Sequence, residues 1–202
     1  MGTVRDGRYA VRRANLADMA ELLRMQLALQ ASIDEIAGRM LRVNPASAAK
    51  LHDYYETQIH DAHARVLVAE TIGRGQVVGM GTGRVWTHAD YLPPQSGELI
   101  DLWVDPEHRR RGLALRIVSR LLEFFRERRI EFLALNYVLG NGSGERFWKK
   151  LGFEHVLVTA TADRAEVERS MAIASRQIVP LACSGAGDSR HRSVYSRQVL
   201  SG

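Results

Sequence analysis

Apolar residues recur along this chain with two different periods, which predict alternating strands and helices. Runs typical of β-strands cover residues 9–13, 65–71, 76–86, 98–104, 132–137 and 153–160. Helical spacing of apolar residues begins near Met19, Ala46, Leu115 and Ser143. The predicted order is therefore a strand, two helices, three strands, a helix, a strand, a helix and a strand.

Two of these helices carry an apolar face that identifies the side turned toward a core. The first follows Asn15, a residue type suited to cap a helix. The predicted core-facing residues are Met19, Leu22, Leu23 and Leu27 in the first helix, and Leu115, Val118, Leu121, Leu122 and Phe125 in the later one.

The strand at 98–104 ends in a turn that combines a proline, three arginines and a glycine. Asp105-Pro106 prevents the strand from continuing unaltered, Arg109-Arg110-Arg111-Gly112 follows, and a helical pattern begins directly afterwards. The first turn of a helix has backbone N–H groups without internal partners and the positive end of the helix dipole. Gly112 leaves room for a close ligand, and the arginines add positive charge. The sequence therefore predicts a cradle for an anion such as a pyrophosphate.

The same turn resembles the cofactor signature of a known enzyme family. Read as Arg109-x-x-Gly112-x-Ala114, it is similar to the (Gln/Arg)-x-x-Gly-x-(Gly/Ala) motif of the GNAT acyl-CoA N-acyltransferases, and the likeness extends from about Tyr9 to about Thr161. The resemblance implies the GNAT fold, an α+β architecture whose mixed, mostly antiparallel central sheet is flanked by helices. It also implies that acetyl-CoA is the cosubstrate, held chiefly by main-chain amides. The implied cofactor-binding residues of this segment are Leu102, Trp103, Val104, Arg109, Arg110, Arg111, Gly112, Leu113 and Ala114.

A second segment carries the same resemblance. The run from Asn141 through Gly144 and Phe147-Trp148 to Phe153 is similar to the family pattern Asn-x-x-Ala-x-x-(apolar)-Tyr-x-x-x-Gly-Phe. The likeness implies that Asn141 lies against the pantetheine arm of the cofactor and that Phe147 belongs to the same site. Trp148 stands where the family has a tyrosine, often the acid that protonates the departing CoA thiolate. Because an indole N–H cannot deliver a proton at neutral pH, the general acid is left open and Trp148 is predicted to pack.

Acylation of an amine requires the neutral amine, and a carboxylate near the reaction centre can remove the extra proton. Glu98 lies six residues before Val104, and several GNAT enzymes carry their general base at this spacing. The resemblance therefore makes Glu98 the first candidate for the base, directly or through a water, with Asp101 in reserve. Alternation along a strand places these two residues on opposite faces unless a bulge intervenes, as it does in the family.

Composition and charge exclude a membrane-spanning or disulfide-rich protein but do not identify a function. The chain has 202 residues, which suits one well-buried domain, and no apolar run approaches the length of a membrane span. The single Cys183 excludes an internal disulfide framework and is consistent with a cytoplasmic location. The net charge of +5 favours anionic ligands in general, both nucleotide-bearing cofactors and nucleic acids.

Two further patterns suggest chemistry, but a simpler interpretation is preferred for each. His60-x-x-His63 could face a metal ion, yet solvated histidines are the preferred interpretation and no metal site is expected. Glycines alternate within the strand at 76–86, which favours one face of the sheet cleared for close packing or for substrate over a nucleotide-binding loop. These glycines are Gly79, Gly81 and Gly83.

The combined patterns predict a GNAT domain over residues 1–162, a helical extension over 163–180 and a mobile basic tail over 181–202. The expected activity is transfer of an acetyl group from acetyl-CoA to a primary amine by direct attack on the thioester. The acceptor is a small-molecule or peptide amine, and the choice among small amines, antibiotics, amino acids and protein termini is left open, as is preference for another acyl-CoA. A CoA-binding regulatory module without catalysis is the alternative, and a basic nucleic-acid-binding protein is a weaker one. A homodimer is also left open.

Overall fold

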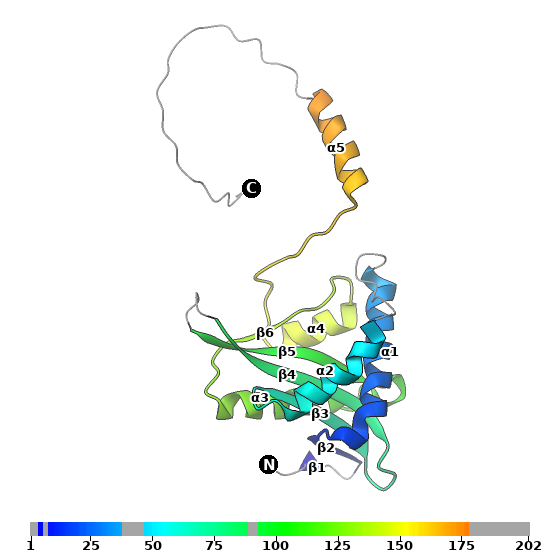
Figure 1. Cartoon of the computed structure of the whole chain (residues 1–202), viewed down its shortest axis with the longest axis vertical. Coiled ribbons are helices and arrows are strands. Elements are labelled where there is room, and N and C mark those ends of the chain that lie inside the picture. The colour runs from blue at the N-terminus through cyan, green and yellow to red at the C-terminus, as the bar shows by residue number, and fades with distance from the viewer. Residues whose placement is uncertain (1–3, 6–7, 38–46, 89–92, 178–202) are drawn as a thin grey trace. The chain divides into compact units, whose positions relative to one another are not determined.

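Six strands form a single sheet in which neighbours follow one another in chain order (Figure 1). The computed structural model describes residues 4–5, 8–37, 47–88 and 93–177. Each neighbouring pair is antiparallel except the last, in which β6 runs parallel to β5. The strands are β1 (Val4–Arg5), β2 (Tyr9–Arg13), β3 (Ala64–Thr71), β4 (Val77–Thr87), β5 (Gln95–Val104) and β6 (Leu133–Leu135). This confirms the predicted mixed, mostly antiparallel sheet.

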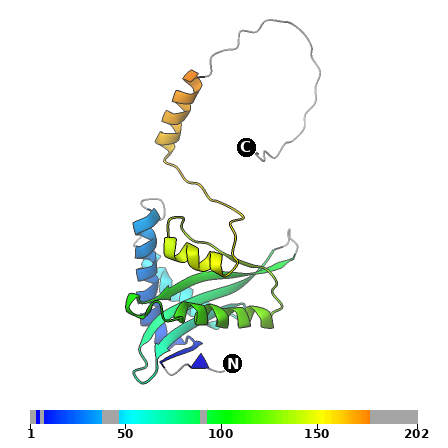
Figure 2. The same ribbon diagram turned by 180° about the vertical axis from the view of Figure 1, so that it is seen from behind.

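Helices cover both faces of the sheet, as two opposite views show (Figure 1 and Figure 2). The helices α1 (Met19–Ala37) and α2 (Ala48–His60) lie on one face, and α3 (Leu113–Glu127) lies on the other. One buried cluster joins α3 to the sheet, and α4 (Gly142–Lys150) adds Trp148 to it. A second buried cluster joins α1 and α2 to the opposite face. The sheet therefore has an apolar core on each side.

The chain enters α1 through a capped turn, η1 (Leu16–Asp18). The Asn15 side chain accepts a hydrogen bond from the Ala17 backbone N–H at 2.9 Å, and the Asp18 carboxylate accepts one from the Asn15 N–H at 2.9 Å. This reciprocal capping box confirms Asn15 as the cap. The guanidinium of Arg12 on β2 also pairs with Asp18, at 2.8 Å, and so joins the start of the helix to the sheet.

The alternating glycines of β4 allow α3 to lie close against the sheet. A Cβ atom at Gly81 would stand 2.3 Å from Cγ2 of Ile117, and one at Gly83 would stand 2.9 Å from the ring of Phe125. A larger residue at either position would collide with the helix, because side chains in a packed core leave few voids. The packing interpretation of these glycines is therefore confirmed.

The predicted helix faces are wrong at three positions. In α1, Leu27 is 50% exposed, and in α3 Leu115 and Leu122 are 52% and 41% exposed. The apolar residues of α3 fill a wider arc than the sheet can cover, so those at its margin face outward. The buried residues of α3 are Leu113, Ile117, Val118, Leu121, Phe124 and Phe125.

The last predicted strand is also wrong. Residues 153–160 form no strand, and β6 is limited to Leu133–Leu135 within the predicted 132–137. Val156 and Leu157 expose 95% and 88% of their surface. An alternating sequence forms a strand only where a neighbour supplies a hydrogen-bonding ladder, and no strand of the described residues pairs with this segment.

Contacts along the backbone divide the chain into two units, Met1–Leu157 and Val158–Gly202. The second contains α5 (Arg164–Gln177), which confirms a helix in the predicted stretch at 163–180. The predicted tail at 181–202 lies outside the described residues. No described helix combines the length and the apolar character that a membrane crossing requires.

Candidate active site

A bulge in β5 places two carboxyl groups on the same face of the sheet. The pairing of β5 with β4 steps from Asp101 directly to Leu99, so Ile100 is an extra residue between them. Leu99 packs in the cluster on the α3 side, whereas Trp103 packs in the cluster with α1 and α2. Alternation on either side of the bulge therefore turns both Glu98 and Asp101 toward α1 and α2. The bulge that the resemblance implies is present, and the two candidate bases share one face.

Both carboxylate oxygens of Glu98 accept hydrogen bonds from neighbouring strands. The indole Nε1 of Trp86, on β4, donates to Oε2 at 2.6 Å, and Nδ2 of Asn136, directly after β6, donates to Oε1 at 3.0 Å. The side chain is only partly buried, so solvent or a ligand still reaches it. Two donors, one on β4 and one directly after β6, fix the direction of the carboxylate and leave each oxygen a free lone pair for a proton or a water.

Asp101 lies deeper than Glu98, in a polar group enclosed by α1 and α2. It is 7% exposed, and the hydroxyl of Tyr55 lies 3.4 Å from its Oδ2 and donates to Oε1 of Gln26 at 2.8 Å. Burial raises the pKa of the Asp101 carboxyl, and its hydrogen bonds offset only part of that rise. Burial and the nearby Asp101 likewise raise the pKa of Tyr54, which neighbours Tyr55 on α2. Asp101 is thus held toward its neutral form.

The cofactor segment of β5 has one edge without a neighbouring strand. Pairing with β6 ends at Leu99 and Leu135, and from there β5 continues to Val104 against β4 alone. No strand in the described part of the chain lies along the other edge of Leu102–Val104. An open strand edge presents backbone donors and acceptors that an extended ligand arm can pair with.

The turn after β5 leads into α3 at the position where the sequence predicts an anion cradle. A short helical turn, η4 (Pro106–His108), is followed by Gly112, which caps α3 with φ 77° and offers no side-chain hydrogen bond to the first-turn amides. A Cβ atom at Gly112 would meet no other atom within 4 Å. Open space therefore lies beside Gly112, at the positive end of the helix dipole.

The three arginines of the turn differ in their surroundings. Arg109 donates from Nε to the carbonyl of Val104 at 2.8 Å, and its guanidinium lies 4.7 Å from the ring centre of Trp103. Arg111 donates to the hydroxyl of Tyr9 at 3.1 Å. Arg110 is exposed and has a positive φ of 61°. Arg109 and Arg111 thus fix the turn to the sheet, which the sequence alone did not indicate.

The second predicted cofactor segment forms the start of α4. Asn141 caps this helix, because its Oδ1 accepts a hydrogen bond from the Gly144 N–H at 3.2 Å. Phe147 is partly buried, and its ring centre lies 4.8 Å from that of Trp148. Trp148 is 9% exposed and also contacts Phe153, with ring centres 5.6 Å apart. Trp148 is therefore a packing residue, as predicted.

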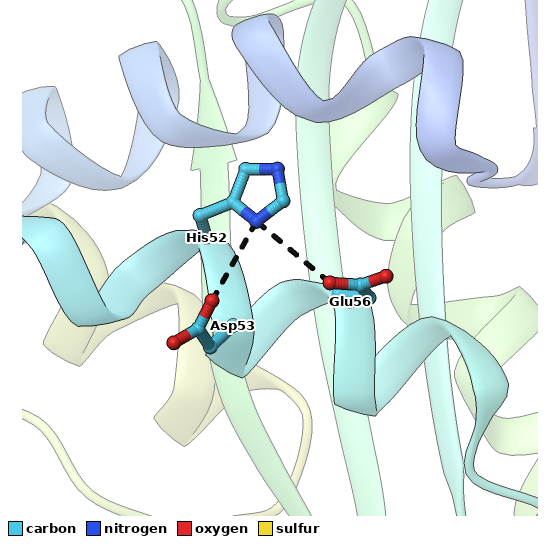
Figure 3. A group of neighbouring side chains, drawn as sticks. All are labelled: His52, Asp53 and Glu56. Carbon is cyan, nitrogen blue, oxygen red and sulfur yellow. Dashed lines mark ion pairs between the residues drawn. The ribbon is translucent and has the colours of Figure 1, made fainter.

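One group of potential metal ligands lies on the outer surface of α2, outside the predicted positions (Figure 3). The Nδ1 atom of His52 stands 3.8 Å from Asp53 and 3.9 Å from Glu56, and all three residues are exposed. Loose ion pairs on a solvated helix face account for this group. The histidine singled out by the sequence, His60, instead contacts the Glu56 carbonyl at 2.8 Å through its ring Nδ1.

Comparison with known proteins identifies the family. Residues 32–153, more than half of the chain, match the sequence model of the acetyltransferase (GNAT) family. The chain belongs to the GNAT acetyltransferase family. It is accordingly an N-acetyltransferase by family. No curated protein matches the chain.

Solved structures with the GNAT fold resemble this one closely in shape and only distantly in sequence. A GCN5-related N-acetyltransferase from Ralstonia eutropha is 21% identical, with a TM-score of 0.64 over 77% of this chain and 98% of its own. A predicted acetyltransferase from Clostridium acetobutylicum, solved with acetyl-CoA, is 17% identical, with a TM-score of 0.64 over 78% of this chain and 97% of its own. An aminoglycoside 6'-N-acetyltransferase from Acinetobacter baumannii is 16% identical, with a TM-score of 0.58 over 77% and 97%. These likenesses confirm the GNAT fold.

The GNAT cosubstrate acetyl-CoA suits the cradle on physical grounds. Open space beside Gly112 and the start of α3 without a side-chain cap match the needs of a pyrophosphate, which binds backbone N–H groups at a helix N-terminus. The open edge of β5 matches an extended amide-bearing arm such as pantetheine. The residues present are therefore compatible with this ligand.

Sequence analysis missed two polar residues that lie beside the candidate bases, Asn136 next to Glu98 and Gln26 next to Tyr55 and Asp101. Asn136 was not singled out, although the parallel register pairs Ala134 with Glu98 and so turns Asn136 to the same face. Gln26 was overlooked because its role depends on contact with Tyr55 across two helices. Only the register of β6 could have supplied a signal for Asn136, and that register is not visible in the sequence.

Proposed function

We propose that this GNAT enzyme transfers an acetyl group from acetyl-CoA to a primary amine and that Glu98 is the general base. The observation that carries the proposal is the setting of Glu98, a partly buried carboxylate oriented by Trp86 and Asn136. It lies on the face that α1 and α2 cover, beside the cofactor segment of β5. A base must be held in one direction toward the reacting amine, and the two hydrogen bonds that orient Glu98 support this role.

In the proposed reaction, Glu98 removes a proton from the ammonium form of the acceptor, directly or through a water. The neutral amine attacks the thioester carbonyl, so that a C–N bond forms, the C–S bond breaks and the nitrogen releases its second proton to solvent. Backbone amides along Leu102–Val104 polarise the carbonyl oxygen as charge develops on it. CoA leaves as a thiolate that takes its proton from solvent, because the indole of Trp148 is no acid at neutral pH.

The proposed cofactor site extends from the β5 edge to the helix α4. Main-chain groups of the turn hold the pyrophosphate, with Arg110 adding charge from the exposed side and Arg109 and Arg111 supporting the backbone. Asn141 and Phe147 complete the site near the pantetheine arm. The full proposed set is Leu102, Trp103, Val104, Arg109, Arg110, Arg111, Gly112, Leu113, Ala114, Asn141 and Phe147.

The test is Glu98→Gln, which keeps the size of the side chain and one acceptor oxygen and removes the group that takes up the proton. Turnover should fall by about 10²–10⁴-fold, and the defect should shrink as pH rises, because more of the amine is then neutral without help. Acetyl-CoA affinity should hardly change. Glu131→Gln, at an exposed residue outside the site, is the matched control and should keep full activity. Wild-type turnover in Glu98→Gln would remove Glu98 from the mechanism and transfer the role to Asp101 or to solvent.

A second candidate function is a CoA-binding regulatory module, which the replacement of the family's tyrosine by Trp148 favours. An assay of CoA release in the presence of amines distinguishes the enzyme from the regulatory module. A regulator would bind acetyl-CoA and be stabilised by it, without CoA release in the presence of any amine. A screen of small amines, aminoglycosides, amino acids and peptide N-termini for CoA release separates them and identifies the acceptor.

A further inference from the structure

The cofactor turn is joined to α1 by an ion pair outside the proposed active site. Arg24 on α1 contacts both carboxylate oxygens of Asp105, with Nη1 at 3.1 Å from Oδ1 and Nη2 at 2.8 Å from Oδ2. Asp105 is the residue that follows β5 and begins the turn. Two parallel hydrogen bonds between a guanidinium and a carboxylate fix the direction of both groups.

Asp105 is in turn connected to Arg109, in the middle of the turn, through the side chain of Trp103. The indole Nε1 of Trp103 donates to Oδ1 of Asp105 at 2.9 Å, and the guanidinium of Arg109 stacks on the same indole ring with 4.7 Å to its centre. Burial opposes the ionisation of Asp105, but the hydrogen bonds from Arg24 and Trp103 outweigh it and lower the pKa of this carboxyl. A continuous series of contacts therefore runs from α1 to the middle of the turn.

We propose that Arg24 is a positioning residue for the cofactor turn, acting through Asp105 and Trp103 on Arg109 and thereby on affinity for the pyrophosphate of acetyl-CoA. The inference rests on the proposed use of acetyl-CoA at this turn. Without Arg24, the Asp105 carboxylate keeps only its Trp103 contact on this side and gains freedom to rotate. The indole N–H of Trp103 then lacks a hydrogen-bond acceptor held in one position. The guanidinium of Arg109, which stacks on this ring, is therefore less well positioned. The turn must be ordered at the moment of binding, which lowers affinity.

A stabilising role alone would give a different result. The Arg24 side chain is 45% exposed, and ion pairs at such positions add little to the free energy of unfolding. The positioning role therefore predicts a change in ligand affinity with almost no change in Tm. It also predicts that only ligands carrying the pyrophosphate are affected, because pantetheine lies along β5 rather than in the turn.

The experiment compares two ligands on the full-length protein by calorimetry, acetyl-CoA and S-acetylpantetheine, which lacks the pyrophosphate. Arg24→Met, which keeps an unbranched apolar stem, should weaken acetyl-CoA binding by about tenfold, or about 1.4 kcal/mol. S-acetylpantetheine affinity should be unchanged. Glu21→Gln is the matched control, because Glu21 contacts Nε of Arg24 at 2.7 Å without touching Asp105. This variant should bind acetyl-CoA as the wild type does.

Asp105→Asn completes the test as a double-mutant cycle. If Arg24 acts through Asp105, the double variant should bind acetyl-CoA no more weakly than the weaker single variant. Wild-type affinity in Arg24→Met, or an equal loss for both ligands, would overturn the inference and leave the proposed function intact. Failure of the wild-type protein to bind acetyl-CoA would instead overturn the proposed function and this inference together.

Discussion

Glu98 and Asp101 share one face of β5 although their spacing along a regular strand would separate them. The extra residue at Ile100 accounts for this, because it shifts the alternation by one position. The two carboxyl groups then occupy different environments, Glu98 partly open and Asp101 nearly enclosed. Two carboxyl groups on one face with different burial suit different roles. The following predictions test the roles of Glu98 and Asp101 individually.

Trp86→Phe should lower kcat without weakening acetyl-CoA binding. Phenylalanine keeps an aromatic ring at this position and removes the N–H that donates to Glu98 at 2.6 Å. The carboxylate then loses one of its two fixed donors and samples unproductive directions, which should reduce kcat by about tenfold. Steady-state kinetics at saturating acetyl-CoA measures the effect. An unchanged kcat would mean that Asn136 alone is sufficient to orient the base.

Asp101→Asn should stabilise the protein more at high pH than at low pH. Burial raises the pKa of the Asp101 carboxyl, so the stability provided by its neutral form is complete below the ordinary pKa and is lost as pH rises through the raised value. Asparagine has the shape of the neutral carboxyl and does not ionise. Differential scanning calorimetry from about pH 4 to about pH 8 should show a gain in Tm that grows with pH. A difference that is constant across this range would contradict the assignment.

Gly112→Asn should abolish most acetyl-CoA binding while the protein remains folded. Gly112 has φ 77°, a conformation that asparagine adopts more readily than other residues with side chains, and the added atoms would occupy the open space of the cradle. Gly112→Val blocks the same space and in addition strains the backbone, which should cost about 1–3 kcal/mol of stability. Calorimetric titration and thermal unfolding of both variants distinguish the two effects. A folded Gly112→Asn protein with full affinity would place the pyrophosphate elsewhere.

Trp148→Phe should retain most of the activity, because the indole packs against Phe147 and Phe153 and supplies no proton. Trp148→Tyr introduces a phenol at this position and is expected to keep or raise the rate. Initial rates and acetyl-CoA affinity of the two variants provide the measurement. Loss of turnover in Trp148→Phe with intact binding would assign the indole a direct function.

The turn after β5 and the start of α3 could be predicted from sequence because they depend on a few neighbouring residues. A helix start, a glycine and adjacent arginines define an anion cradle within a few residues, and Gly112 and Ala114 lie where that pattern places them. The setting of Glu98 could not be predicted, because Trp86 and Asn136 reach it from two other strands whose registers depend on the whole sheet. The missing strand at 153–160 has the same origin, since its alternation is clear but strand formation requires a partner.

The close packing of α3 on β4 also determines where the first turn of α3 lies relative to β5. Gly79, Gly81 and Gly83 determine how near the axis of α3 comes to the sheet, and the first turn of that helix is part of the cradle. A single carbon added at Gly81 would stand 2.3 Å from Cγ2 of Ile117, so that this side chain or α3 itself would have to move away from the sheet. For acetyl-CoA bound as proposed, the separation between its phosphates and its thioester would thus be set in part by residues that have no side chain.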